Sequence, residues 1–367
     1  MNFTRKGRVS SIALVGALAL SACGSDNNAG GTGGDTAASD ADCGSTALKA
    51  EGSSAQDNAI QDAIANFKEQ CPEQTVTYNA TGSGSGIKNF IAGQVNFAGS
   101  DSALKTEDGE TEQADADKKC GSPAWNLPMV TGPIAVSYNL KGVDDLVLTP
   151  SVIAGIFQGK IAKWNDPKIA KINDGVDLPA TQIKPFFRSD ESGTTENFTS
   201  YLKQSAPKDW TAEPSKKWPG KGQGKAKTAG VAAAVQQTDG GITYAEWSGA
   251  KDNKLGIAKV DNGAGPVELT GESAGKAVSA AKSVGKGNNL KLELDYATKT
   301  KGAYPIILVT YEVVCSEYSD PAVGKSVKSF LKYFGSKEQQ KNLEEIGYAP
   351  LPSEVQSNVE TAISAIK

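Results

Sequence analysis

The sequence predicts an α/β protein whose β-sheet is parallel or mixed. Apolar residues recur every three or four positions at 59–67 and again at 87–91, a spacing typical of amphipathic helices. Alternating residues at 74–80 and β-branched residues at 305–315 indicate strands. Because strands, Gly/Ser loops and helices alternate, we expect helices on the faces of the sheet and a ligand at the carboxyl ends of its strands.

The remaining elements follow from the same signals, and two prolines mark helix boundaries. Pro72 ends the first helix, and Pro150 suits the first position of a later one. The stretch 208–227 is polar and rich in Lys, Trp, Gly and Pro, so we expect a long loop there. Its GKGQGKAK segment lacks the spacing of a phosphate-binding P-loop and is expected to be a surface loop. Strands are expected at 46–51, 74–80, 95–101, 125–139, 183–188, 241–247 and 305–315. Helices are expected at 59–67, 87–91, 150–159, 194–202, 229–237, 322–334 and 338–346, with the last two closing the chain.

Length and composition limit the function classes. A chain of 367 residues is comfortable for two domains. The net charge of −4 argues against a nucleic-acid partner, which normally meets a basic surface. The chain contains no histidine, so Ser-His and Cys-His nucleophile pairs are excluded and the commonest metal ligand is missing.

The N-terminus predicts export and lipid anchoring. Three basic residues precede an apolar run at 12–20 that is too short to span a bilayer, so residues 1–22 are expected to be a signal peptide. The run ends in LSAC, which resembles a bacterial lipobox, and Cys23 is then the lipid-modified first residue of the mature protein. The alternative is a conventional signal peptide with a chance cysteine. Residues 23–42 are rich in Gly, Ser and Asp and are expected to be a flexible tether.

The four cysteines left after Cys23 suggest two disulfides in an exported chain. Three pairings are possible, and four buried free thiols are the alternative. We favour Cys43–Cys71, because this bond would join the starts of two neighbouring strands. Cys120–Cys315 then follows by elimination.

Three segments share a design that suits an anion: a strand, a short Gly/Ser/Thr loop, and a helix start. They lie at 52–55, 81–86 and 191–194. Helix starts expose unpaired N–H groups and partial positive charge, and glycine lets an anion approach the backbone. One such segment would be explained by ordinary helix capping. Three of them, with Arg188 beside the third, favour an anion site, although Arg188 could also form a surface ion pair with Asp190 or Glu191.

Several longer stretches strengthen this interpretation. They are TGSGSGIKNFIAGQVNFAGSD, IFQGKIAKWNDPKI, FRSDESGTTENFTSYL, GVAAAVQQTDGGITYAEW and the late YAPLP. Together they resemble the phosphate-binding lipoproteins of bacterial high-affinity phosphate ABC importers, over nearly all of the chain after the tether. The resemblance implies a type II-like two-lobe periplasmic-binding-protein fold, with a hinge made of two crossing segments. Lobe 1 would hold 43–129 and 305–367, and lobe 2 would hold 130–304.

The resemblance also implies the ligand residues, which come from four separate parts of the chain. Asp190 matches a carboxylate that orients the arginine. The first loop departs from the family, which often has Thr-Phe where this chain has Ser54-Ala55. The implied phosphate ligands are Ser54, Ala55, Ser83, Asp101, Arg188, Ser192, Gly193 and Thr194.

Asp101 would allow this site to distinguish phosphate from sulfate. A carboxylate only accepts hydrogen bonds, and near neutral pH phosphate keeps at least one proton whereas sulfate keeps none. A site built around a donated hydrogen can reject an analogue that lacks it by about 10⁴-fold. The alternative role for Asp101 is a helix cap after its strand.

The expected function is therefore that of a solute receptor and not of an enzyme. It would capture inorganic phosphate between its lobes and deliver it to the permease subunits and ATPase of an ABC importer. We expect a monomer on the extracytoplasmic side of the cell membrane, held by its lipid anchor, with no cofactor, metal or nucleic-acid partner. The alternatives are a receptor for another oxyanion such as sulfate or molybdate, a phosphatase-like enzyme, and an adhesive surface lipoprotein.

Overall fold

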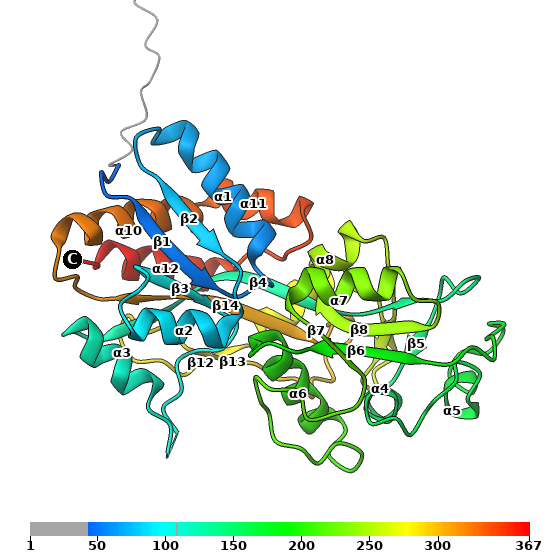
Figure 1. Cartoon of the computed structure of the whole chain (residues 1–367). Coiled ribbons are helices and arrows are strands. Elements are labelled where there is room, and N and C mark those ends of the chain that lie inside the picture. Colours follow the sequence, from blue (N-terminus) through cyan, green and yellow to red (C-terminus); the bar gives the residue numbers. More distant parts are fainter. Residues whose placement is uncertain (1–42, 108) are drawn as a thin grey trace, which may run out of the picture. The chain divides into compact units, whose positions relative to one another are not determined.

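A computed structural model describes residues 43–107 and 109–367 (Figure 1). The expected signal peptide, the tether and Cys23 lie outside these residues. Within the described residues, no helix is long and apolar enough to cross a membrane. The fold is the mixed α/β arrangement that the sequence predicts.

One large sheet runs through the described part of the chain in the order β2-β1-β3-β14-β4-β8-β6-β7, with β9 also paired to β4. β1 is parallel to β2 and β3, whereas β14 is antiparallel to β3 and β4. β8 is antiparallel to β4, and β8, β6 and β7 are parallel to one another. The strands are β1 (Leu48–Gly52), β2 (Val76–Asn79), β3 (Phe97–Ser100), β4 (Ala124–Asn139), β6 (Lys184–Arg188), β7 (Gln223–Lys225), β8 (Gly241–Glu246), β9 (Gly256–Ile257) and β14 (Ile307–Cys315).

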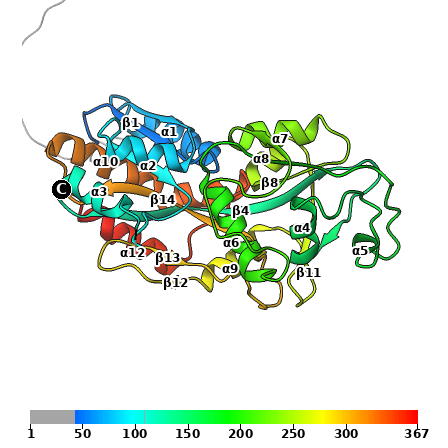
Figure 2. The same ribbon diagram turned by 60° about the horizontal axis from the view of Figure 1, so that its bottom comes forward.

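Helices gather in two groups at the opposite ends of β4 and β14, as Figures 1 and 2 show. The group near the start of β4 is α1 (Asp57–Gln70), α2 (Ser83–Ile91), α3 (Glu112–Cys120), α10 (Pro321–Phe334), α11 (Lys337–Glu345) and α12 (Ser353–Ser364). The second group includes α4 (Pro150–Phe157), α5 (Pro167–Ala170), α6 (Gly193–Ser205), α7 (Lys227–Gln236) and α8 (Trp247–Asp252). The other elements are α9 (Gly271–Ser279) and the short strands β5 (Val147–Leu148), β10 (Lys259–Asp261), β11 (Pro266–Val267), β12 (Lys282–Ser283) and β13 (Leu292–Glu293).

β4 connects two large hydrophobic cores. Its first part pairs with β14, and its second part, from Ile134 onward, pairs with β8. Val130 packs in the first core, which draws on 48–130 and 313–366. Ile134 packs in the second, which draws on 134–308 together with Ala55. The chain therefore passes from the first core to the second within β4, and passes back to the first core within β14.

Two sequence predictions about elements were wrong. A third helix, α12, follows the two that were expected to close the chain, and it buries Val359 and Ile363 on the first core. Part of the expected loop 208–227 forms β7, which pairs in parallel with β6. All three β7 residues are exposed, so this edge strand has no apolar alternation that would reveal it.

Both favoured disulfides are present. Cys43 is bonded to Cys71, ahead of β1 and β2, and Cys120 at the end of α3 is bonded to Cys315 at the end of β14. Each bond joins segments that are far apart in the sequence, and both lie at the edge of the first core. They restrict the unfolded chain more than the folded one, which is how such bonds stabilise exported domains.

Candidate functional site

Asp101 is the centre of the site. It follows β3, is 3% exposed, and accepts hydrogen bonds on both carboxylate oxygens. Ser53 and Thr310 donate to Oδ1, the latter over 2.9 Å, and Thr194 donates to Oδ2 over 3.0 Å. Its backbone N–H donates to Ser83 Oγ over 3.2 Å. The loop before α1, the start of α2, the start of α6 and the middle of β14 thus meet at one carboxylate.

Gly193 allows this close approach. A Cβ atom at this position would lie 2.7 Å from both the Asp101 Cβ and the Ser83 Oγ, closer than non-bonded atoms can stand. The first turn of α6 can therefore touch the end of β3 and the start of α2 only because residue 193 is glycine. The Gly/Ser/Thr composition of the loops serves packing as well as hydrogen bonding.

Four backbone N–H groups at these helix starts have no partner. The N–H groups of Ser54, Ser83, Gly193 and Thr194 donate no hydrogen bond to any residue in the described ranges, although all four residues are buried. Ser192 serves as the N-cap of α6 instead, since its Oγ accepts from the Thr195 N–H over 3.2 Å. Buried helix starts without partners are rare in folded proteins. An oxyanion is the ligand that satisfies such donors.

Arg188 supplies the positive charge, and it is the only arginine in the described part of the chain. Its side chain is 2% exposed, so the surface ion pair considered from the sequence is not what forms. Nε donates to Asp190 Oδ1 over 2.8 Å and Nη2 donates to Oδ2. Glu191 contacts Lys88 and Lys217 instead. No residue in the described ranges accepts a hydrogen bond from Arg188 Nη1, which leaves this group for an anion.

The two aspartates have opposite electrostatic environments. Burial acts to raise the pKa of Asp190, but hydrogen bonds from Arg188 and its charge outweigh this and hold the pKa below its usual value. Burial raises the pKa of Asp101, and the hydroxyl donors and the charge of Arg188 only partly oppose it. A carboxylate has about four acceptor positions. Three hydroxyl groups already use three of them on Asp101, so one position remains for a hydrogen carried by a ligand.

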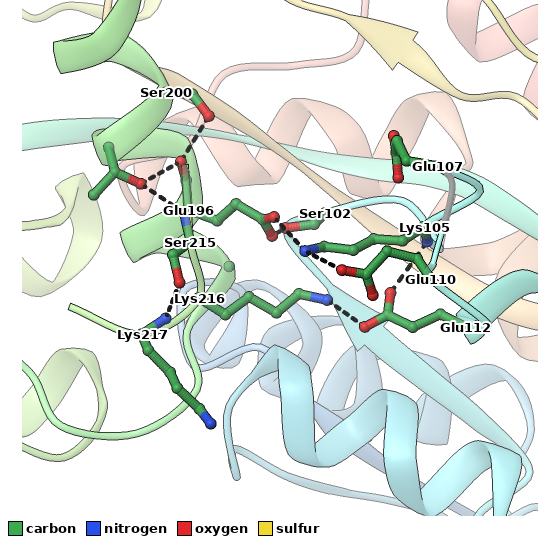
Figure 3. Close-up of polar contacts among 12 residues, drawn as sticks. Ser102, Lys105, Glu107, Glu110, Glu112, Glu196, Ser200, Ser215, Lys216 and Lys217 are labelled. Carbon is green, nitrogen blue, oxygen red and sulfur yellow. Dashed lines mark hydrogen bonds and ion pairs between the residues drawn. The ribbon is translucent and has the colours of Figure 1, made fainter. Parts of the chain in front are cut away.

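Charged side chains close the rim of the site, as Figure 3 shows. Lys216 Nζ lies 2.8 Å from Glu112 Oε1, and the two side chains are only 10% and 23% exposed. Lys105 Nζ lies 3.4 Å from Glu196 Oε1, and Ser102 Oγ donates to Glu196 Oε2 over 2.5 Å. Each pair joins a residue that precedes β4 to one that follows it. These contacts join the two sides of the site.

The predicted residues come together with some differences in detail. Ser83, Asp101, Gly193 and Thr194 are in mutual contact. The Ala55 N–H donates to Ser53 Oγ over 3.0 Å, so its role as a ligand donor stays a prediction.

Three residues that contact this network, Thr228, Thr310 and Ser53, were not predicted as site residues from the sequence. Ser54 Oγ lies 3.2 Å from Thr228 Oγ1 and accepts from the Thr228 N–H, which links the first loop to the start of α7. Thr310 was missed because a single threonine inside a β-branched strand carries no signal of a polar role. Ser53, a third omission, stood in a loop that the sequence had already singled out.

The described residues hold no group of three or more acidic or cysteine side chains arranged to bind a metal ion. The donor set of the site points the same way, because N–H and hydroxyl groups bind anions.

Comparison with known proteins places the chain in a family. A family model described as a PBP superfamily domain matches residues 30–338. The phosphate-binding protein PstS 3 of Mycobacterium tuberculosis (strain ATCC 25618 / H37Rv) is 44% identical over 100% of both chains, and the phosphate-binding protein PstS 2 of the same strain is 41% identical over 100% of both. Among solved structures, the phosphate-binding protein from Stenotrophomonas maltophilia has a TM-score of 0.64 at 21% identity, covering 86% of this chain and 93% of that chain.

The chain therefore belongs to the PBP superfamily, and within it to the family of the PstS phosphate-binding proteins. Its fold is the type II-like two-lobe α/β fold, in which two segments of the chain cross between the lobes. In this chain β4 and β14 are the strands that take part in both cores.

Proposed function

We propose that this protein captures inorganic phosphate in the site around Asp101 and delivers it to an ABC importer. The observation that carries the proposal is the set of four unpaired, buried N–H groups beside Arg188 and Asp101. The phosphate ligands are Ser54, Ala55, Ser83, Asp101, Arg188, Ser192, Gly193 and Thr194, with Asp190 orienting the arginine. The full-length relatives that are 44% and 41% identical are phosphate-binding proteins by name, which supports the same ligand here.

Selectivity for phosphate follows from the hydrogen that Asp101 can still accept. A hydrogen on the bound phosphate donates to this carboxylate and forms a charge-assisted bond. Sulfate has no hydrogen to offer, so its oxygens would face a buried carboxylate with nothing between them. Leaving a buried charged group without its partner costs more than about 1–3 kcal/mol. Sulfate and molybdate are therefore poor ligands.

The site works by enclosing its ligand and performs no chemical step. Lobe 1, made of 43–129 and 305–367, and lobe 2, made of 130–304, close around phosphate by bending at β4 and near residue 305. The closed form is what the permease subunits recognise, and the ATPase then drives uptake. Cys23 carries the lipid anchor that holds the monomer at the outer face of the cell membrane.

Isothermal titration calorimetry on dialysed protein tests the proposal. We expect one phosphate per chain, with heats for sulfate and molybdate indistinguishable from buffer. A phosphatase assay with added divalent cations should give no turnover. No heat with phosphate, or binding of sulfate with comparable affinity, would refute the proposed function.

A further inference from the structure

A second buried carboxyl group lies beside the site and has no assigned role. Glu312 is on β14, two residues after Thr310, and is 0% exposed. Its backbone lies opposite Gly99 on β3 and Leu127 on β4. Neither carboxyl oxygen of Glu312 has a hydrogen-bond partner among the described residues. A buried carboxylate without donors is unfavourable by several kcal/mol, so the ionised form of this side chain does not fit its surroundings.

Gln56, like Glu312, has a buried side-chain oxygen without a hydrogen-bond partner among the described residues. It is the N-cap residue of α1, is 0% exposed, and its Oε1 also has no partner in the described part of the chain. Its amide lies over Gly99, where a Cβ would come within 2.0 Å of Nε2. Glu312 stands directly opposite Gly99 on β3, so its side chain lies on the face of the sheet where the Gln56 amide covers Gly99. The two side chains with unpaired oxygens are therefore neighbours.

The hydrogen bonds of Tyr78 determine which way the Gln56 amide is turned. The Tyr78 hydroxyl has one hydrogen, and it donates this to the Ser53 carbonyl over 2.7 Å. Tyr78 can then only accept from Gln56, whose Nε2 donates to it over 3.1 Å. This orients the Gln56 amide and turns its Oε1, an acceptor, away from Tyr78. The second hydrogen of Nε2 makes no hydrogen bond with either Glu312 oxygen. The acceptor Oε1 can bond to the neighbouring carboxyl group only if that group carries the hydrogen.

We propose that Glu312 is held as a protonated carboxylic acid that donates to Gln56 Oε1 and, through Gln56 and Tyr78, positions the anion-binding loop 53–56. The inference rests on the proposed function of that loop in phosphate binding. Glu312 itself touches no ligand and acts as a positioning residue. The chain of bonds runs from Glu312 to Gln56, from Gln56 to Tyr78, and from Tyr78 to the carbonyl of Ser53, whose hydroxyl donates to Asp101.

The electrostatics of the surroundings agree with this assignment. Burial raises the pKa of Glu312 to about 8, and the charge of Asp101 raises it further, whereas Gln56 lowers it. Tyr78, on β2, is the other titratable group that faces Glu312, and its pKa is raised well above the usual value by burial and by Glu312. Leu127 of β4 carries no charge. On β8, burial raises the pKa of Glu246 to about 8 as well, and the charge of Asp101 raises it further.

The consequence is a dependence of phosphate affinity on pH that the ligand alone does not produce. Above about pH 8, Glu312 loses its hydrogen, the contact with Gln56 becomes repulsive, and a second buried negative charge stands near Asp101. Binding of an anion must then compete with this charge. Because a bound anion favours the protonated form of Glu312, affinity falls as pH rises, by up to about tenfold per unit.

The variant Glu312→Gln separates the proposal from a merely structural role. Its amide keeps a hydrogen for Gln56 Oε1 and cannot ionise. Phosphate affinity is measured by calorimetry from about pH 7 to about pH 9.5, with Glu317→Gln, an exposed residue just after β14, as the matched control. We expect the ratio of wild-type to E312Q affinity to fall at least about threefold over this range and E317Q to follow the wild type. Parallel profiles for wild type and E312Q would overturn the proposal.

A measurement without phosphate keeps the inference testable if E312Q does not fold or if the chain binds no phosphate. Infrared difference spectra of protein with isotope-labelled glutamate should show a protonated carboxyl band near pH 7 that is lost by about pH 9.5. In Glu246→Gln, which removes the other buried glutamate with a raised pKa, the band of Glu312 should remain. Absence of any such band in E246Q would overturn the assignment whatever the chain binds.

Discussion

Arg188 and Asp101 are held inside the protein by different partners. Asp190 accepts two hydrogen bonds from Arg188 and holds the guanidinium in one orientation. Asp101 is surrounded by hydroxyl donors and lies within the electrostatic reach of that same guanidinium. Under the proposed function, the guanidinium attracts the oxyanion and the carboxylate accepts the hydrogen that the oxyanion carries. At the protein surface these interactions would be much weaker, because water would compete for every hydrogen bond.

The substitution Arg188→Lys tests the contribution of a single residue to phosphate binding. A lysine keeps the charge but cannot hold Asp190 by two bonds and offer a further donor to a ligand. We expect phosphate affinity to fall about 10- to 100-fold, the equivalent of one charge-assisted hydrogen bond. Calorimetry measures this, and the reverse exchange at an exposed position of the same strand, Lys184→Arg, should leave affinity unchanged. Equal affinity in R188K and wild type would remove Arg188 from the site.

The site residues that could be predicted from the sequence are those that belong to a recognisable motif. The Gly/Ser/Thr loops and Arg188 stood together in the sequence, so the anion site could be inferred from helix-start chemistry. The burial of the Arg188–Asp190 pair and the role of Thr310 could not, because both depend on how distant segments pack. Glu312 gave no signal either, since one glutamate inside a β-branched strand reads as a solvent-facing position of an alternating pattern.

At the scale of elements, the strand–loop–helix unit is what places donors at the site. The first loop follows β1, the second precedes α2 and the third precedes α6, and the register of β1, β2 and β3 brings the first two side by side. Periodicity identified these units because their strands and helices each have a buried face. It failed for β7, which is exposed at the sheet edge. In α12 the apolar residues Val355, Val359 and Ile363 do recur at helical spacing, so that helix could have been predicted and was overlooked.

Gly193→Ala tests the close approach of α6. The added methyl group would overlap Asp101 and Ser83, so the helix start must move away and its N–H groups with it. We expect phosphate affinity to fall by more than about tenfold, and the melting temperature to fall as well, because overpacking a buried contact costs about 1–3 kcal/mol. Gly230→Ala in α7 is the matched control, since its Cβ would meet its nearest neighbour at an ordinary 3.7 Å. Unchanged affinity in G193A would show that the α6 start does not contact the ligand.

At the scale of the whole molecule, the proposed function makes closure of the lobes and recognition of the anion one event. The contacts of Lys216 with Glu112, and of Lys105 and Ser102 with Glu196, join residues on the two sides of β4 (Figure 3). They form only when the two sides are together. Under the proposed function, these contacts stabilise the closed arrangement and lengthen the time for which a captured anion stays bound. The two-lobe fold followed from resemblance of whole segments, because composition alone indicates only an α/β chain.

Lys216→Gln tests this role of the rim. The substitution removes a partly buried ion pair worth about 1 kcal/mol, so we expect phosphate to dissociate a few-fold faster in stopped-flow experiments. Lys203→Gln is the control, because Lys203 pairs with Glu213 on its own side of the site. Identical dissociation rates for K216Q and wild type would mean that the rim contacts do not hold the closed form.

The central claim is that Asp101 accepts a hydrogen from a tetrahedral oxyanion held by the converging helix starts. The most direct test is the ratio of phosphate to sulfate affinity, measured by calorimetry in wild type and in Asp101→Asn. Asparagine removes the charge and can donate to an oxygen, so we predict a ratio of about 10⁴ or more in wild type and a collapse of that ratio in D101N, with weaker phosphate and measurable sulfate binding. Sulfate rejection that persists undiminished in D101N would contradict the account.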